Sequence, residues 1–195
     1  MKIYSYKSYD DYVRAQTQAN KQKIERVWAK DYVLRQLLDY VKSPKTILCH
    51  GSRNGGEMKM LKKLYPDAEI LGTDISETAN QFENTIQHDF QEPKEEWVNK
   101  WDILYSNSFD HCFDPAKCLT TWKNQLSKSG LMFVELMLGN DNRSSRSDPL
   151  QIVEKEFRDL AKNVGLEVIS KLPGRYWANF TILGSEVYVL KRIES

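Results

Sequence analysis

The stretch Thr46-Ile47-Leu48-Cys49-His50-Gly51-Ser52-Arg53-Asn54-Gly55-Gly56-Glu57 decides the fold of this chain. Its first part is apolar and ends at a glycine, which predicts a buried strand followed by a tight turn. Residues 58–64 then place apolar side chains at helical spacing, so a helix is expected directly after the turn. A strand, a glycine turn and a helix N-terminus in this order present backbone N–H groups to a small ligand.

A second apolar strand is predicted at residues 70–74 and ends in Asp74. This acid lies about 20 residues after the glycines, where a nucleotide-binding βαβ unit carries its ribose-binding carboxylate. Further strands are predicted at 85–90, 102–106, 131–136, 166–169 and 186–190. Helices separate all but the last two strands. The order predicts a Rossmann-like, doubly wound α/β fold: a seven-stranded, mostly parallel sheet with an antiparallel last strand and helices on both faces.

Helical patterns cover residues 9–41, as one long helix or two consecutive ones, and residues 115–129 and 149–164. A chain of 195 residues is expected to form one domain, and no linker or internal repeat divides it. We therefore expect a single domain over 1–195. Residues 1–43 would form an N-terminal helical segment that acts as a lid, and residues 44–195 the Rossmann-like core.

The composition is that of a soluble protein, with 41% hydrophobic residues, 28% charged residues and a mean hydropathy of −0.61. The sequence has neither a membrane-spanning apolar run nor a signal-peptide core. Its three cysteines lack the spacing of a zinc site or a disulfide framework, so a cytoplasmic location without membrane association is expected. The net charge of +1 argues against a nucleic-acid partner.

Polar residues follow several predicted strands at the point where each strand ends. Gly51, Asp74, Asp89, residues 106–111 and the polar stretch 139–148 all have this position. Because parallel strands end at one edge of the sheet, these residues are expected to converge there on a ligand. The stretch 139–148 is interpreted as either a mobile loop or a substrate loop.

The glycine turn also indicates the kind of ligand. Gly51, Arg53 and Gly56 occupy the positions of a dinucleotide fingerprint, but the middle position must be glycine for the backbone to approach a pyrophosphate. Arg53 therefore disfavours a dinucleotide, whereas a nucleoside cofactor without phosphates makes no such demand.

Over residues 45–191 the sequence resembles the class I S-adenosylmethionine-dependent methyltransferases. The turn matches their first motif, acid-x-Gly-x-Gly-x-Gly, except that Cys49 replaces the acid and Arg53 the middle glycine. The resemblance implies S-adenosylmethionine as cofactor, S-adenosylhomocysteine as product, and a ribose contact for Asp74. The full set of implied cofactor-binding residues is His50, Gly51, Ser52, Arg53, Gly55, Asp74, Ile75, Asp89, Phe90, Ser106 and Asn107.

Within this set, Asp89 and Phe90 match the adenine-contacting pair, and Ser106 and Asn107 match the motif beside the transferable methyl group. The acid that Cys49 replaces usually helps to hold the methionine amino group. In this chain His50 or backbone carbonyls would have to take over that contact.

A narrower resemblance concerns residues 51–55 and residues 105–111. Together these two segments are similar to those of a small methyltransferase subgroup found in bacterial surface-polysaccharide clusters and large viruses. Some members of that subgroup are sugar O-methyltransferases. It implies methyl transfer to a hydroxyl of a sugar, a glycan or a similar small polar acceptor.

A hydroxyl acceptor needs a base that takes its proton as the new bond forms. His111 lies just beyond Asn107, and imidazole changes charge near neutral pH, so we assign His111 as the general base and Asp110 as the residue that orients it or the acceptor. A purely structural His111 is the alternative. Asp110, His111 and Asp114 could instead ligate Mg²⁺, but Asp114 before Pro115 is also an ordinary helix N-cap, and a divalent metal is not favoured.

Two other functions stay open. One is an N-methyltransferase acting on protein or nucleic acid, although the sequence after the fourth strand, Ser106-Asn107-Ser108-Phe109, lacks the Asn-Pro-Pro-Tyr type of motif. The other is a non-catalytic binding protein on the same fold, which the replacements at Cys49 and Arg53 would allow. The sequence names neither the acceptor nor the oligomeric state.

Overall fold

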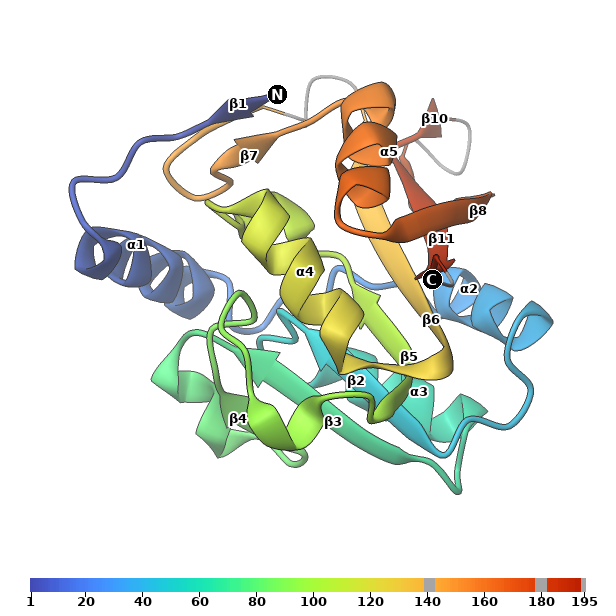
Figure 1. Ribbon diagram of the computed structural model, residues 1–195. Coiled ribbons are helices and arrows are strands. Elements are labelled where there is room, and N and C mark those ends of the chain that lie inside the picture. Colours follow the sequence, from blue (N-terminus) through green and yellow to red (C-terminus); the bar gives the residue numbers. More distant parts are fainter. Residues whose placement is uncertain (139–142, 178–181, 194–195) are drawn as a thin grey trace.

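The computed structural model describes residues 1–138, 143–177 and 182–193, and its centre is one seven-stranded sheet (Figure 1). The strand order is β4-β3-β2-β5-β6-β11-β8. The strands are β2 (Thr46–His50), β3 (Glu69–Asp74), β4 (Thr85–Gln87), β5 (Trp101–Ser106), β6 (Leu126–Met137), β8 (Leu166–Pro173) and β11 (Ser185–Arg192). Strands β2 to β6 pair in parallel, and β11 is antiparallel to both β6 and β8. The predicted fold class is confirmed.

The strand β2 lies where the winding of the sheet reverses. The chain proceeds from β2 to β3 and β4 on one side, and then returns to β5 and β6 on the other. In an open sheet of this kind the turns after the two strands at the reversal diverge and leave a crevice beyond their carboxyl ends. The glycine turn follows β2, and residues 107–111 follow β5, so both border this crevice.

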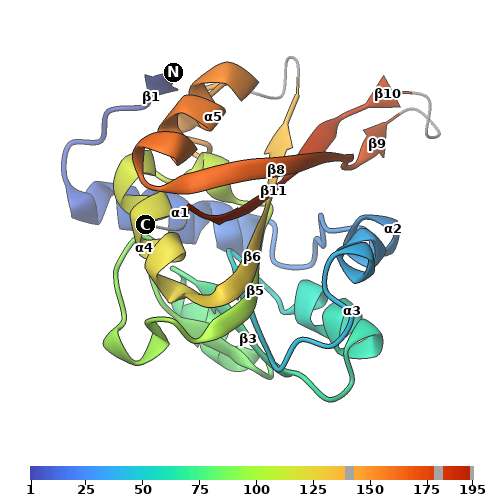
Figure 2. The ribbon, with the colours of Figure 1, turned by 45° about the vertical axis from the view of Figure 1, so that its right-hand side comes forward.

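Helices cover both faces of the sheet (Figure 2). On one face lie α4 (Pro115–Gln125) and α5 (Glu154–Asn163), and on the other lie α2 (Asp31–Leu34), the 3₁₀ helix η1 (Arg35–Asp39) and α3 (Gly56–Leu64). The remaining helical elements are α1 (Tyr9–Gln22), η2 (Glu77–Gln81), η3 (Glu95–Trp97) and η4 (Phe109–His111). Short strand pairs are formed by β1 (Lys2–Ile3) with β7 (Leu150–Gln151), and by β9 (Tyr176–Trp177) with β10 (Ile182–Leu183).

Adjacent residues of the central strands belong to different cores. Ile47 packs with Leu34 and Leu61 on one face, whereas Leu48 packs with Trp122 and its neighbours on the other. All of these side chains are fully buried. Because successive strand residues point to opposite faces, a strand that is covered on both faces is apolar throughout.

The predicted helical segment 9–41 is divided into parts with different positions. Helix α1 starts at Ser8, whose side chain accepts a hydrogen bond from the Asp11 amide, and ends at Gln22. After residues 23–30, α2 and η1 bury Val33 and Leu37 completely within the core. The second part therefore belongs to the core of the domain, and α1 alone remains a candidate for the predicted lid.

Two predicted helix boundaries are wrong. The helix expected to end at Gly130 ends at Gln125, because Leu126 is extended and pairs with Trp101 at the start of β6. The helix expected from Pro149 starts at Glu154, because residues 150–151 pair with the N-terminal residues 2–3 as strand β7. In both cases a partner distant in the sequence extends a segment whose local pattern is helical.

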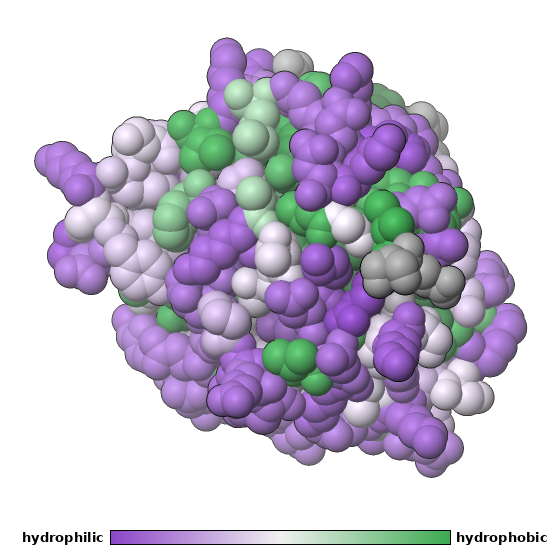
Figure 3. Space-filling model, in the orientation of Figure 1, coloured by the Kyte–Doolittle hydropathy of each residue, from purple (hydrophilic) through white to green (hydrophobic). Residues whose placement is uncertain are grey.

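The surface in Figure 3 is mostly hydrophilic, with apolar side chains in small separate patches. Among the helices of residues 1–138, 143–177 and 182–193, none combines the length and apolarity needed to cross a membrane.

We predict that Trp122→Ala removes a large part of the stability of the fold. Trp122 is fully buried, stacks on His50 and donates a hydrogen bond from Nε1 to the carbonyl oxygen of Phe90 at 2.9 Å. Loss of this side chain should lower the free energy of unfolding by about 3–5 kcal/mol. Urea denaturation measures the change, with Thr120→Ala on the exposed side of α4 as the control. A loss no greater than that of the control would contradict this account of the core.

Candidate active site

Two adjoining cavities lie at the carboxyl edge of the sheet. The first is lined by Tyr12, Gln16, Ala19, Asn20, Lys23, Gly51, Arg53, Asp74, Ile75, Phe90, Ser108 and His111. The second is lined by Lys23, Trp28, Arg53, Asn107, Ser108, Asp110, His111, Met137, Asp148 and Arg175. Lys23, Arg53, Ser108 and His111 belong to both linings, so the cavities meet at these residues.

The glycine turn forms one wall of the first cavity. Gly51 has φ +74°, and a Cβ atom added to it would lie 2.4 Å from the Cβ atom of Ser108, so no larger residue fits there. Arg53 also has a left-handed backbone, with φ +47°. Such a conformation costs a non-glycine residue roughly 1–2 kcal/mol, so the turn holds Arg53 in place against a local preference.

Asp74 ends β3 and faces the first cavity together with Ile75. Its carboxylate accepts hydrogen bonds from the amides of Arg53 at 3.1 Å and Ser76 at 3.0 Å. Burial raises the pKa of Asp74, and these amides and the Arg53 charge oppose the shift. A carboxylate oxygen has more than one lone pair, so each oxygen can accept a further bond from a ligand.

Asp89 and Phe90 differ in their contacts. Phe90 lines the first cavity. The carboxylate of Asp89 is buried and accepts hydrogen bonds from the Tyr9 hydroxyl at 3.0 Å and the Gln91 amide at 3.0 Å. The acid expected to contact adenine thus joins α1 to the loop after β4.

The side chain of His50 lies inside the core rather than at either cavity. Its Nδ1 is 2.8 Å from the Thr73 hydroxyl, its Nε2 is 2.8 Å from Gln125 Oε1, and its ring stacks on Trp122. Burial lowers the pKa of His50 to about 3, so the ring is neutral at physiological pH. The ring faces away from the crevice, so the geometry does not support the predicted cofactor contact of the His50 side chain.

Three other residues of the predicted cofactor set stabilise the backbone of the glycine turn and of the elements next to it. Ser52 donates from Oγ to the carbonyl oxygen of Thr73, and Ser106 donates from Oγ to the carbonyl oxygen of His50. Gly55 has φ +75° and caps the N-terminus of α3. Asn107, the remaining member, lines the second cavity.

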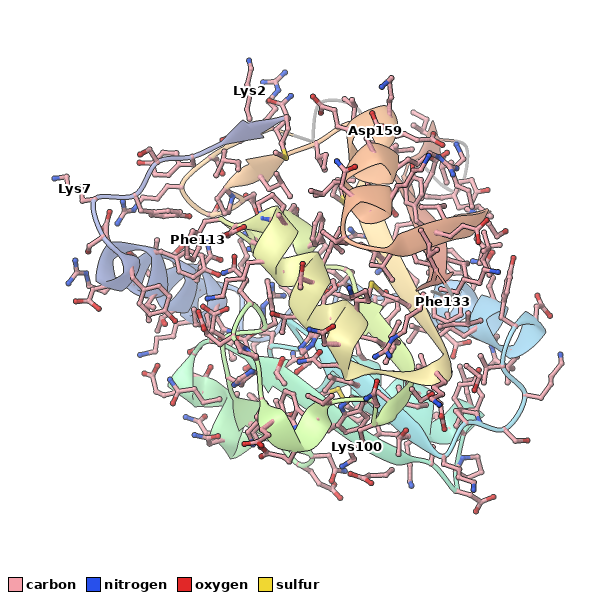
Figure 4. The ribbon with its side chains drawn as sticks, viewed as in Figure 1. Lys2, Lys7, Lys100, Phe113, Phe133 and Asp159 are labelled. Carbon is pink, nitrogen blue, oxygen red and sulfur yellow. The ribbon has the colours of Figure 1, made fainter. Side chains whose placement is uncertain are left out.

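Helix α1, part of the segment expected to act as a lid, contributes a wall of the first cavity, although its individual lining residues were not predicted. Its lining residues follow one another at helical spacing, namely Tyr12, Gln16, Ala19, Asn20 and, just past the helix, Lys23. The periodicity was present in the sequence, but the face is largely polar, and only apolar stripes indicate a packed helix face. Tyr12 packs against Phe113, which lies beside this helix in Figure 4, with a ring separation of 4.5 Å.

Asn20 is a specific part of this wall. It is 6% exposed, and its Oδ1 accepts a hydrogen bond from the Thr78 hydroxyl at 3.0 Å. Its buried Nδ2 has no hydrogen-bond partner among the residues that the structure describes. A buried amide without a partner is costly, and a ligand in the cavity that Asn20 lines would satisfy it.

An ion pair joins α1 to the loop that follows residue 142. Arg146 donates from Nη1 and Nη2 to the two carboxylate oxygens of Asp11, at 3.2 and 2.6 Å. This hydrogen bonding lowers the pKa of Asp11 to about 2. Of the predicted loop 139–148, residues 139–142 lie outside the described residues, and the remainder is thus joined to the helix.

The hydrogen bonds of Gln16 fix the tautomer of His111. Gln16 Nε2 is 3.1 Å from the carbonyl oxygen of Ser147, which can only accept, so this nitrogen is the donor. Gln16 Oε1 therefore faces His111 Nδ1, at 2.9 Å, and an amide oxygen can only accept. The proton lies on Nδ1, so the lone pair of a neutral His111 is on Nε2, and His111 lines both cavities.

Two carboxylates flank this Nε2, with Asp148 Oδ1 at 3.6 Å and Asp110 Oδ1 at 3.9 Å. Burial raises the pKa of Asp110. Burial also acts to raise that of Asp148, but His111, the Ser147 hydroxyl, Lys23 and Ser145 outweigh it, and the pKa of Asp148 is lowered. Asp148 therefore stays ionised beside His111.

Asp110, His111 and Asp148 offer ligand atoms within 4.8 Å of one another and have the chemistry to hold a metal ion. The set differs from the predicted one. Asp114 accepts a hydrogen bond from the Lys117 amide and caps α4, as expected of an acid before Pro115.

The second cavity combines charged groups with an aromatic ring. The Arg175 guanidinium is buried and donates from Nε to Glu135 Oε1 at 2.7 Å, and it lies 5.8 Å from the Trp28 ring. Glu135 also accepts from the Tyr105 hydroxyl at 2.9 Å. One wall of this cavity is therefore fixed by a buried ion pair.

Neither a protein-family model nor a curated protein matches this chain in sequence. Solved structures do match. The 1,6-didemethyltoxoflavin-N1-methyltransferase of Burkholderia thailandensis, whose structure holds S-adenosylhomocysteine, is 12% identical, with a TM-score of 0.76 over 98% of this chain and 93% of that one. A structure containing a putative methyltransferase of Haloferax volcanii with the Trm112 activator matches at 15% identity and 0.71, over 97% and 100%. CcbJ of Streptomyces caelestis matches at 12% and 0.65, over 95% and 100%. The chain has the fold of the class I methyltransferases.

Glu57 in the first turn of α3 is a buried acid behind the glycine turn. It is 5% exposed, and burial raises its pKa to about 7. The Arg53 charge and a hydrogen bond with Asn107 act to lower this pKa, but burial has the larger effect. The folded state thus binds a proton at Glu57 over a pH range in which the unfolded chain has released it.

We predict that Glu57 lowers stability as pH rises from about 4.5, the usual value for glutamate, to about 7. The stabilisation is fully present below the lower value and is lost at the upper one, and it amounts to roughly 3 kcal/mol for a shift of this size. Glu57→Gln keeps the shape without the titration, so the difference in unfolding free energy between the wild type and this variant should change by that amount. Urea denaturation at pH 4.5 and 7.5 measures it, and a constant difference would contradict the buried position of Glu57.

Proposed function

We propose that this chain is an S-adenosylmethionine-dependent O-methyltransferase that acts on a hydroxyl of a sugar, a glycan or a similar small polar acceptor, with His111 as the general base. The fold supports methyl transfer, because similar structures include the mitomycin 7-O-methyltransferase MmcR and the toxoflavin N1-methyltransferase. The fold alone does not settle the reaction, since the [4+2]-cyclase SpnF shares it. The proposal therefore rests on the site.

The first cavity has the groups that a nucleoside cofactor requires. Asp74 presents a carboxylate for the two ribose hydroxyls, Phe90 and Ile75 present apolar surface for a base, and Asn20 offers an unsatisfied amide donor. Gly51 keeps the wall free of side-chain atoms. S-adenosylmethionine bound here would supply an electrophilic methyl group on a positively charged sulfur.

The observation that carries the proposal is the fixed tautomer of His111. Because Nδ1 donates to Gln16, the lone pair of a neutral His111 is on Nε2, and His111 is a residue that lines both cavities. A general base must present an acceptor atom to the proton that it removes, and this geometry provides one at the boundary between the two cavities.

The flanking residues support the proton transfer. A bound cofactor would supply the methyl group, and its sulfur would keep the electron pair of the bond that breaks. Nε2 of His111 would take the proton that the acceptor hydroxyl loses. The resulting imidazolium lies beside Asp148, whose ionised carboxylate stabilises the positive charge, and the proton then leaves to solvent. Asp148 thus shares the orienting role that we expected for Asp110.

The second cavity suits a small polar acceptor. Asn107, Asp110 and Asp148 supply hydrogen-bonding groups, and Trp28 supplies a flat apolar surface. A pocket with a few placed polar groups and an aromatic wall fixes the orientation of a ring that carries several hydroxyls. Positioning of the acceptor behind the methyl group accounts for much of the catalysis of such a displacement.

We predict that the wild-type protein binds S-adenosylhomocysteine in isothermal titration. Asp74→Ala should weaken binding about tenfold or more, because it removes a charged acceptor of hydrogen bonds. Asp74→Asn removes the charge but places an NH2 donor against one of the two backbone amides that Asp74 accepts from, so this variant tests the turn as well as the ligand contact. A wild-type protein that does not bind the ligand would exclude the proposed cofactor.

We predict that His111→Asn lowers kcat by about 10²–10⁴-fold while the affinity for S-adenosylhomocysteine stays within a few-fold of the wild type. His88→Asn is the matched control, because His88 contacts Glu92 and Trp97 and lines neither cavity. Unchanged turnover in His111→Asn would remove His111 as the base.

An acceptor screen that measures S-adenosylhomocysteine release supplies the substrate for that comparison. It should include nucleotide sugars, oligosaccharides, small hydroxy compounds and nitrogen heterocycles, each with and without EDTA. Activity on nitrogen heterocycles alone would replace O-methylation by N-methylation. Loss of activity in EDTA would assign Asp110, His111 and Asp148 to a metal instead of a proton.

A further inference from the structure

Arg53 stands at a position where the resembling motif has glycine, and the hydrogen bond of its guanidinium within the described residues goes to the backbone carbonyl of Arg26. It is the residue of the glycine turn that lines both cavities. Its left-handed backbone, at φ +47°, would suit glycine better. The backbone amide makes the bond to Asp74, and any residue with an N–H could make that bond.

The hydrogen bonds of the guanidinium are incomplete. Nη1 donates to the carbonyl oxygen of Arg26 at 3.1 Å. Nε is buried and has no hydrogen-bond partner in the described part of the chain. The ion pairs found among residues 1–138, 143–177 and 182–193 do not include Arg53. Asp74, Glu57 and Asp148 balance part of the Arg53 charge, but a buried donor without an acceptor is unfavourable unless a ligand supplies one, and a carboxylate is a strong acceptor for a guanidinium.

The position of Arg53 along the crevice indicates which part of the bound cofactor lies beside it. Phe90, Ile75 and Asp74 belong to the first cavity only, whereas Arg53, Ser108 and His111 lie where it opens into the second. A nucleoside with its ribose at Asp74 and its reactive end at His111 must therefore bring its amino-acid portion alongside Arg53. The carboxylate is the single anionic group of S-adenosylmethionine.

The replacement at Cys49 fits the same arrangement. Its thiol is fully buried, and burial raises its pKa well above the ordinary value, so it is uncharged. This position therefore offers no anion to the cofactor's ammonium group, and the turn offers a cation instead.

We propose that Arg53 binds the methionine carboxylate of the cofactor, so that the amino-acid end is held through its anion. This inference rests on the proposed use of S-adenosylmethionine, and it identifies Arg53 as a residue that selects cofactors with a carboxylate. An anionic group on the methyl acceptor is the competing partner for the same guanidinium.

The test compares two ligands that differ only in the carboxylate. These are S-adenosylhomocysteine and its decarboxylated analogue S-adenosyl-3-thiopropylamine, both titrated calorimetrically into the full chain. Arg53→Gly removes the guanidinium and places glycine where the backbone is left-handed, so folding is preserved. Arg53→Lys keeps the charge without the planar fork, and Arg26→Met is the matched control, because Arg26 is an exposed cation that lines neither cavity.

We expect Arg53→Gly to weaken S-adenosylhomocysteine about ten- to a hundredfold and to change the affinity for the analogue less than about twofold. Arg53→Lys should recover part of the loss, and Arg26→Met should leave both affinities unchanged. Equal losses for the two ligands, or no loss for either, would overturn the proposal. An unchanged affinity for both ligands together with a raised KM for an acceptor would assign Arg53 to the acceptor. A wild-type protein that binds neither ligand would instead refute the proposed cofactor itself.

Discussion

The close packing of the glycine turn against the residues after β5 is the constraint on which the site depends. Gly51 leaves no room for a Cβ atom beside Ser108, and the Ser108 hydroxyl donates to the carbonyl oxygen of Gly51 at 3.3 Å. Ser106 makes the corresponding bond to His50 one residue earlier. These contacts join the two strand ends on either side of the winding reversal, and with them the turn and the segment that carries His111.

Helix α1 completes the crevice with polar contacts in addition to the packing of Tyr12 on Phe113. Tyr9 donates to Asp89, Asp11 pairs with Arg146, and Gln16 bonds to His111. Polar interfaces of this kind contribute less net stability than apolar packing, because each bond replaces one to water. A wall of the first cavity is thereby held by directional bonds, which fix the orientation of His111. This is how one helix both covers a cavity and sets the tautomer of the proposed base.

The buried charged residues around the crevice differ in how their charges are compensated. Arg175 and Glu135 neutralise each other and form a fixed wall. Glu57 is protonated more readily than an ordinary glutamate, because its environment favours the neutral form. Arg53 retains an unused donor. Arg53 and Lys23 both line the two cavities as cations, and the buried Nε of Arg53 is a donor that a bound ligand can complement.

The fold class follows from the sequence by itself. Apolar strands of five or six residues, the glycine turn and Asp74 at the next strand end specify a doubly wound sheet, because each is a local signal of strand, turn or helix. The carboxyl-edge position of Asp74, Phe90, Asn107 and His111 followed from strand order alone. The tertiary structure decided what local pattern cannot: that Leu126 and Leu150 extend into strands through distant partners, that the His50 ring turns into the core, and that α1 brings Gln16 and Asn20 to the crevice. The physical reason is that a polar helix face carries no signal of its own burial until the groups that bond to it, from segments far along the chain, are in place.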